Sequence, residues 1–475
     1  TSEVLREMGV ALSKSPEVSS YQIYAGTSAP INFNGLVRQY YFRQSPALGD
    51  IQVNLVDKHH RSDQSHLIAS RIRPALQEIA KKYNANVKVV EVPPGPPVLS
   101  PIVAEIYGPT PEGRLSVSKS VRAALERTDG VVDIDDSSIA KSPKQFLLVD
   151  RRKASLMGVS QQAIVTTLRA GLAGENVAYI HDESKYPAPT EIRLPENKQG
   201  SLKELLKLTV RNSQREAVPL SQLVSIVDAD REQIIYRKDL LPVSYVIGDT
   251  AGKVDSPLYG LFKARSLTKE IKDPNGKEVE EFFTAAPSDP YQSYAIKWDG
   301  EWQVTYETFR DMGAAYAVGL ILIYLLVVAH FGSYLTPLVI MAPIPLTIIG
   351  VMPGHALLSA QFTATSMIGM IALAGIIVRN SILLVDFINL QVRQGIAFKD
   401  AVVDAAITRA QPIALTGLAA MLGAFFILDD PIFNGLAISL IFGILVSTAL
   451  TLVAIPLLYY SVYAHRVDKI LQSTH

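Results

Sequence analysis

The sequence predicts an α-helical membrane bundle with five spans, joined to a water-soluble α+β region. Formal net charge is zero and mean hydropathy is only +0.20, but these averages hide two very different parts. Charged residues crowd into residues 1–311, whereas residues 312–378 contain no Asp, Glu, Lys or Arg. Because a segment needs about twenty mostly apolar residues to cross a bilayer, the second part is long enough for several spans.

Five segments have the length and apolar character of membrane spans. The second contains several prolines, which a helix bundle tolerates where neighbouring groups satisfy the freed backbone. Between the third and fourth spans, Gly395–Arg409 carries apolar residues at helical spacing, which predicts an amphipathic helix at the inner membrane surface or an ordinary loop helix. The predicted spans are 312–331, 335–357, 363–390, 411–428 and 433–463.

The distribution of Lys and Arg predicts the orientation of the bundle. Basic residues follow the third and fifth spans, and positive-inside bias assigns these loops to the cytoplasm. Residues 1–311 are then extracytoplasmic, and an odd number of spans requires a further helix upstream. The N-terminal TSEVLREMGV has no initiator Met, basic segment or apolar segment of a signal peptide. We therefore expect the chain to be a fragment.

The soluble part alternates between helical and strand patterns. This alternation predicts several small α+β modules of the ferredoxin-like type, with helices on one face of each sheet. Residues 93–97 (PPGPP) form a stiff connector, and residues 250–290 are expected to be a loop or insertion. Helices are predicted at 1–14, 64–83, 114–128, 160–173 and 202–207, and strands at 20–25, 51–56, 87–92, 103–107, 131–135, 145–149, 192–195, 208–211 and 244–248.

The soluble part lacks the motifs of several function classes. Gly-rich phosphate loops, GxSxG and HExxH are absent, so we expect neither an enzyme nor a cofactor. His59, His60 and His66 have no acidic partner at helpful spacing, which favours a solvated surface cluster over a metal site. Zero net charge without a basic aromatic run argues against nucleic acid. The absence of Cys fits an oxidising compartment.

Arg379 is the feature most indicative of function. It lies inside GIIVRNSILLVDF (Gly375–Phe387), with about a dozen apolar or weakly polar residues before it and about ten after it, near the middle of a span. A charge at that depth costs a few kcal/mol on insertion scales. The alternative is an Arg near a helix end whose side chain reaches the headgroups. The central position favours a functional role.

The membrane part resembles the C-terminal half of resistance-nodulation-division (RND) efflux permeases. The segments that carry this resemblance are GIIVRNSILLVDFIN (Gly375–Asn389), RAQPIALTGLAAMLG (Arg409–Gly423) and the closing apolar run Gly435–Tyr460. In the soluble part, Val149–Gly174 and Ala217–Ile226 resemble the docking segment of these pumps. The match spans nearly the whole chain but only the second half of a pump.

The resemblance implies a proton relay. Family members pass protons through an Asp pair that faces a basic residue and a Thr; here the basic position falls on Arg379 and the hydroxyl on Thr416. The Asp pair is expected in the missing N-terminal half. Most drug exporters have Lys where this chain has Arg379, and because Arg stays protonated, Arg379 is expected to act as a fixed counter-charge. Arg409 matches a family Arg at the start of the following span.

Two further polar residues lie near Arg379. Asp386 follows seven residues later, two helical turns along the same face and about 10 Å away, and is either a second relay group or a residue near the inner interface. Asn380 is grouped with the relay by position, although Asn380 and Asn389 are by default polar contacts between helices.

The resemblance further implies a proton-driven exporter of small hydrophobic or amphiphilic molecules in the cell inner membrane, with a large periplasmic domain. Partners would be a periplasmic adaptor and an outer-membrane channel, and the pump would be a homotrimer. The expected division is 1–110 as a first porter-type module, 111–140 with 240–300 as a second, 141–239 as a docking-type module, 311–463 as the membrane helices and 464–475 as a cytoplasmic tail.

Three alternatives stay open. The same superfamily exports metal ions, but soft metals favour thioether ligands, and only Met8 and Met157 lie outside the membrane part. The resemblance is therefore placed closer to drug and amphiphile exporters than to soft-metal exporters. Lipid export is a second possibility. A non-transporting accessory of protein translocation is the third, and the docking-like segment 149–226 argues against it.

Overall fold

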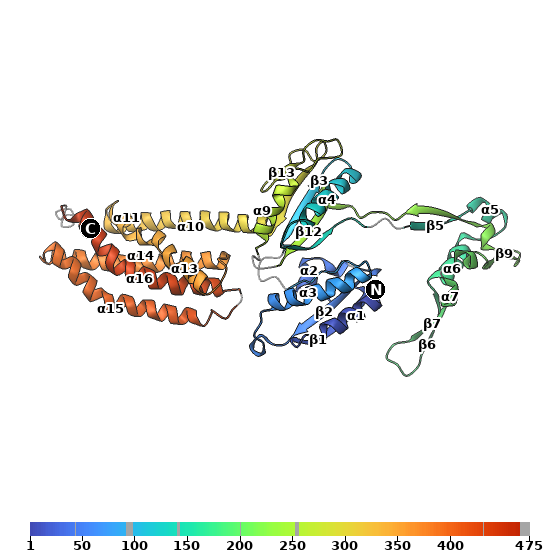
Figure 1. The fold of residues 1–475 in the computed structure, drawn as a ribbon, viewed down its shortest axis with the longest axis horizontal. Helices are drawn as coiled ribbons and strands as arrows, with labels where there is room; N and C mark the ends of the chain where they lie inside the picture. The colour runs from blue at the N-terminus through green and yellow to red at the C-terminus, as the bar shows by residue number, and fades with distance from the viewer. Residues whose placement is uncertain are drawn as a thin grey trace. The chain divides into compact units, whose positions relative to one another are not determined.

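The computed structural model describes residues 1–42, 44–91, 98–139, 143–199, 201–251, 256–430 and 432–465. The chain divides into two compact units, Thr1–Ser137 with Arg237–His475, and Ser138–Tyr236. Figure 1 shows the elements along the chain. The expected connector at residues 93–97 and nearly all of the expected tail at 464–475 lie outside the described residues.

The N-terminal module (residues 1–91) contains a two-stranded antiparallel sheet on which helix α1 (Ser2–Leu12) packs, and helix α3 (Ser65–Lys82) packs against α1 (Figure 1). Its apolar core is small and centres on Met8, Leu12, Leu76 and Ala80. The strand predicted at 87–92 is wrong for residues 87–91, which pair with no strand. The elements are α1 (Ser2–Leu12), β1 (Val18–Thr27), α2 (Phe33–Val37), β2 (Gln44–Leu55) and α3 (Ser65–Lys82).

The second module (residues 98–137 and 237–300) contains a six-stranded sheet. Strand β3 lies between β12 and β14 and is antiparallel to both, while β4 pairs with the other edge of β12. Helices α4 and α9 pack on the sheet over a core that includes Trp298, fully buried. The elements are β3 (Ile102–Tyr107), α4 (Pro111–Glu126), β4 (Val131–Asp136), β11 (Tyr236–Lys238), β12 (Leu241–Thr250), α9 (Pro257–Thr268), β13 (Glu280–Phe282) and β14 (Ala295–Gly300).

Two details of this module differ from the sequence-based expectations. Residues 250–290 are not a loop throughout, because α9 begins at Pro257, which supplies a favourable first helical residue, and β13 follows. Strand β3, which the expected division grouped with residues 1–110, belongs to the sheet of β12 and β14.

The unit Ser138–Tyr236 has its own apolar core, built around Ile164, Leu205, Leu220 and Leu223. Strands β5 and β10 form one antiparallel pair, β6 and β7 a hairpin, and β8 and β9 a third pair. The elements are β5 (Pro143–Val149), α5 (Arg151–Leu156), α6 (Gln161–Leu172), β6 (Glu175–Ile180), β7 (Ala188–Ile192), α7 (Glu196–Gln199), α8 (Leu202–Leu205), β8 (Thr209–Arg211), β9 (Ala217–Pro219) and β10 (Val224–Asp230).

The C-terminal part confirms the helical prediction. Five helical segments of the described residues are long and apolar enough to span a membrane: 301–331, 336–357, 364–393, 398–425 and 434–463. The proline-rich second segment is divided into three short helices. The elements are α10 (Glu301–Phe331), α11 (Thr336–Met341), α12 (Pro343–Leu346), α13 (Ile348–Leu357), α14 (Ala364–Arg393), α15 (Phe398–Phe425) and α16 (Asn434–Tyr463).

The separate surface helix expected at Gly395–Arg409 is wrong. Residues from Phe398 onward form the first turns of α15, which continues through Arg409 and Pro412 to Phe425. The 28 residues of α15 extend about 42 Å at 1.5 Å per residue, more than the ~30 Å apolar thickness of a bilayer. The amphipathic stretch is thus an extension of the fourth span.

Candidate functional site

Arg379 lies near the middle of α14, a helix whose start is fixed by a capping box between Thr363 and Ser366. The Arg379 side chain is exposed on the bundle, while its neighbour Asn380 is 7% exposed and points into it. Within the described residues, no hydrogen bond or ion pair of Arg379 is found. The guanidinium therefore lies on a helix face that this part of the chain leaves uncovered.

The exposed face of α14 runs the length of the helix. Its members recur three, four or seven residues apart, which is the spacing of one helical face. With Arg379 they are Ile368, Ala372, Gly375, Leu383 and Leu390.

Asp386, on the same helix, pairs with His330 in the last turn of α10. The His330 Nε2 and Asp386 Oδ2 atoms are 3.2 Å apart, and both side chains are about half exposed. This pair connects two predicted spans. Sequence reasoning missed His330, since an isolated His at the end of an apolar helix gives no sign of its partner.

Thr416 and Arg409 lie on α15, which packs against α14. The Thr416 hydroxyl donates a hydrogen bond to the Ile413 carbonyl at 3.0 Å. The Arg409 guanidinium lies over the ring of Phe387, 4.9 Å from its centroid, a favourable cation–π contact. Arg409 thus lies beside the residue that follows Asp386, whereas no hydrogen bond joins Arg379 to Thr416 among the described residues.

The bundle is held by polar contacts between helices near the same end of α14. The Tyr459 hydroxyl donates to Asn389 Oδ1 at 2.7 Å, and the Tyr463 and Thr336 hydroxyls are 2.7 Å apart. Asn389 therefore has the helix-joining role expected of it.

A second group of charges is buried in the second module. Glu105, on the central strand β3, is fully buried and forms an ion pair with Lys238, which also pairs with Asp299. Lys297 lies 3.4 Å from Glu105, and the Tyr107 hydroxyl donates to Glu105 at 2.9 Å. The two carboxylates and the two lysine ammonium groups therefore offset each other's charge within the sheet.

The cluster shifts the pKa values of its members in opposite directions. Burial and a hydrogen bond with Asp299 raise the pKa of Glu105, although the ion pair with Lys238 opposes this. Burial alone would also raise the pKa of Asp299, but hydrogen bonds with Glu105 and Lys238 lower it to about 2. Asp299 therefore stays ionised at neutral pH.

The three histidines of the soluble part form no common site in the described residues. His66 Nδ1 pairs with Glu91 at 2.8 Å, and no group of three His, Asp or Glu able to hold a metal ion is found there.

Comparisons with known proteins agree with the resemblance. The profile of the AcrB/AcrD/AcrF family matches residues 1–463. The swarming motility protein SwrC of Bacillus subtilis is 22% identical over 371 residues, 77% of this chain and 33% of that protein. The cobalt-zinc-cadmium resistance protein CzcA of Cupriavidus metallidurans is 24% identical over 389 residues, covering 79% and 34%. The multidrug resistance protein MdtC of Serratia proteamaculans is 26% identical over 348 residues, covering 71% and 32%.

The fold is also similar to a solved structure. A heavy metal efflux pump superposes with a TM-score of 0.73 at 20% identity, covering 97% of this chain and 46% of that one. The chain spans about a third of the length of the curated relatives it matches. Since the family profile covers nearly every residue, the chain belongs to the AcrB/AcrD/AcrF family of RND permeases, which are transporters rather than enzymes.

Proposed function

We propose that this chain is the C-terminal half of a proton-driven efflux transporter of the cell inner membrane. The exposed Arg379 on α14 is the observation that supports this most strongly. A guanidinium facing lipid at mid-bilayer depth is costly, so the uncovered face needs a partner with opposite charge. An N-terminal half carrying paired Asp supplies that charge and completes the relay.

The relay residues then have distinct roles. Arg379 is permanently charged and stabilises the ionised carboxylates after they release their protons. The Thr416 hydroxyl donates to Ile413, so its lone pairs remain able to accept from a guanidinium. Asp386, paired with His330, and Arg409, beside Phe387, act toward the cytoplasmic end. Asn380 lies on the buried face of α14.

The same proposal assigns the soluble part to the periplasm. The strand order β4, β12, β3, β14 with two helices on one face supports a ferredoxin-like porter module. Residues 141–239 are proposed to dock an outer-membrane channel. Their bounds nearly coincide with those of the compact unit Ser138–Tyr236. The working assembly is a homotrimer with a periplasmic adaptor.

For the substrate, we propose small hydrophobic or amphiphilic molecules. Relatives include proteins named for multidrug resistance and for cobalt-zinc-cadmium resistance, so metal export is the second candidate. Met8, one of the two methionines outside the membrane part, is 4% exposed and packed in a core. Its thioether is thus unavailable to a passing soft metal, which favours amphiphiles.

The relay is tested in proteoliposomes that contain the complete pump under an imposed proton gradient. Arg379→Ala is expected to abolish efflux of an amphiphilic dye, because the carboxylates lose their counter-charge and remain protonated. Arg379→Lys is expected to retain efflux with a shifted pH profile, since a buried Lys can titrate.

Leu383→Ala is the matched control, because Leu383 lies on the same exposed face one turn away. It is expected to transport like the wild type. Wild-type efflux by Arg379→Ala would show that the guanidinium is structural. Efflux of zinc or copper ions without dye efflux would assign the pump to metals instead.

A further inference from the structure

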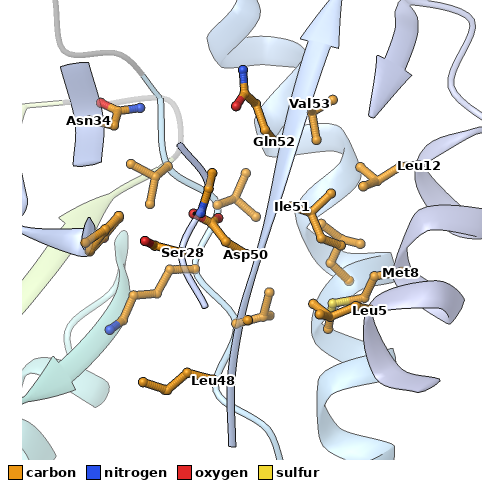
Figure 2. Close-up of a pocket in the computed structure, with 18 of the residues that line it drawn as sticks. Leu5, Met8, Leu12, Ser28, Asn34, Leu48, Asp50, Ile51, Gln52 and Val53 are labelled. Atoms are coloured by element: carbon orange, nitrogen blue, oxygen red, sulfur yellow. Dashed lines mark hydrogen bonds between the residues drawn. The ribbon is translucent and has the colours of Figure 1, made fainter. Parts of the chain in front are cut away.

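The N-terminal module and the second module each have an apolar core of their own. In the N-terminal module, Figure 2 shows Leu5, Met8 and Leu12 beside Ile51 and Val53, next to a groove of about 1050 Å³. The core of the second module lies between its sheet and helices α4 and α9. In the described residues, no helix or strand of one module packs extensively on an element of the other. Two modules without a shared apolar interface are able to move against each other as rigid bodies.

Charged side chains connect the two modules instead. In three ion pairs the N-terminal module supplies the base and the second module the acid. The deepest pair joins α3 to β4, and its two side chains are 9% and 6% exposed. The pairs are Arg73–Asp133, Lys88–Asp135 and Arg38–Asp249.

Two of the three acids lie at one β-bulge between β4 and β12. The pairing of these strands slips by one residue, so that Asp133 and Ile134 together lie opposite Gly248. Asp133 has φ +53°, a left-handed conformation that Asp adopts more readily than most residues but still at a cost. A bulge changes the direction of side chains, and here Asp133 and Asp249 reach bases of the N-terminal module. Backbone strain of this kind is frequent in switch regions.

Asp133 also holds the segment 87–91 in place. Its carboxylate accepts a hydrogen bond from the Val89 amide at 3.2 Å, and Arg73 donates to the Val89 carbonyl at 3.3 Å. The carboxylate, the guanidinium and the backbone of Val89 thus form a closed ring of contacts across the interface. Because both backbone groups of Val89 are bonded in this way, they are not available to a sheet.

The energetics of these pairs allow them to open. Removing two charges from water costs free energy that their mutual attraction repays only in part. In the part of the chain that the structure describes, the buried Nε atoms of Arg38 and Arg73 have no hydrogen-bond partner. Water satisfies these atoms when the modules separate, which lowers the cost of opening.

We propose that this bulge is a latch between the two modules. In the closed arrangement of this structure, Arg73, Lys88 and Arg38 hold the N-terminal module against β4 and β12. When the pairs break, that module swings away as a rigid body and keeps its own core. The opening of the latch in each export cycle rests on the proposed function, whereas the latch itself does not.

The first test measures the separation of the modules in the full chain, held in nanodiscs. Spin labels are attached through Ala75→Cys on α3 and Lys119→Cys on α4, two exposed positions in a chain without native cysteine. Arg73→Met leaves Asp133 without its cation and is expected to raise the population at longer distances about fivefold. Arg73→Lys keeps the charge and is expected to raise it less.

Arg71→Met is the matched control for Arg73→Met. Arg71 lies on the same helix and forms ion pairs with Glu17 and Asp63, which both belong to the N-terminal module. Its loss is expected to leave the distance distribution unchanged. A wild-type distribution in Arg73→Met, or equal separation in Arg71→Met, would overturn the latch.

A second test asks whether the complete pump needs the latch to open. Lys88→Cys combined with Asp135→Cys is bridged by a short, reducible bifunctional thiol reagent, and dye efflux is followed in proteoliposomes. Bridging is expected to lower efflux about tenfold or more, and reduction is expected to restore it. The control bridges Arg71→Cys to Asp63→Cys within one module and is expected to leave efflux unchanged.

The two tests separate the latch from the proposed function. Unchanged efflux after complete bridging of positions 88 and 135 would overturn the opening of the latch, while the efflux itself would support the proposed function. Absence of efflux before bridging would contradict the proposed function instead, and the spin-label distances would still decide the latch.

Discussion

The two modules of the soluble part resemble each other in element order but differ in how completely their sheets are filled. In the second module, β3 is buried on both faces and the core includes Val117, Val121 and Leu125 from α4. In the described residues of the N-terminal module the sheet has two strands, and its core cluster contains four buried residues. In the N-terminal module α1 packs on the two-stranded sheet and α3 packs against α1, so fewer side chains are enclosed between helices and sheet.

The largest expected effect compares the same truncation in the two cores. Leu125→Ala in the second module is expected to cost about 3 kcal/mol, because it opens a cavity among closely packed side chains. Leu76→Ala in the N-terminal module borders an existing groove and is expected to cost about 1 kcal/mol less. Local opening free energies from hydrogen exchange measure both, and equal costs would contradict an incompletely filled N-terminal core.

The buried charges sharpen the comparison. Lys238→Met removes a partner from Glu105, which is fully buried, and is expected to destabilise the second module by about 2 kcal/mol. In the N-terminal module, Asp50 accepts a hydrogen bond from the Ala29 amide in a half-exposed setting. Asp50→Asn is expected to cost about 0.5 kcal/mol. Denaturant titration monitored by hydrogen exchange in each module gives both values. A larger loss of stability for Asp50→Asn than for Lys238→Met would contradict the larger effect expected at the buried site.

Two glycines with nearly the same backbone angle test the packing around them. Gly300 has φ +82° and lies where a Cβ would be 2.6 Å from the carbonyl oxygens of Ser100 and Pro101, whereas Gly26 has φ +80° and open surroundings. Gly300→Ala is expected to cost about 2 kcal/mol, and Gly26→Ala about 1 kcal/mol from backbone strain alone. Thermal unfolding of the two variants provides the measurement, and a larger loss for Gly26→Ala would be inconsistent with this picture.

A further expected effect is a pH dependence in the second module. The pKa of Asp299 is lowered in the folded state to about 2, below its unfolded value. Its ionised form therefore stabilises the module above about pH 4, and this contribution is lost as pH falls from about 4 to about 2. Asp299→Asn should flatten that part of a melting-temperature profile, and an unchanged profile would contradict the lowered pKa of Asp299.

The sequence by itself determined the division into soluble and membrane parts. Apolar length and the charge-free run before Arg379 were sufficient, since the bilayer imposes a minimum span and a large cost on charge. The helices of the soluble part were predicted near their observed positions because their apolar periodicity is local. The position of Arg379 within α14 followed in the same way.

Only the tertiary structure decided which residues meet. His330 and Asp386 are 56 positions apart in sequence. The local sequence around either residue does not predict contact with the other. The predicted strand at residues 87–91 has the alternation of a strand but joins no sheet in the described part of the chain. A helix satisfies its backbone within its own segment, whereas a strand exists only when another strand lies beside it. For that reason the helices could be predicted from local pattern, while the groove of the N-terminal module and the contact between His330 and Asp386 could not.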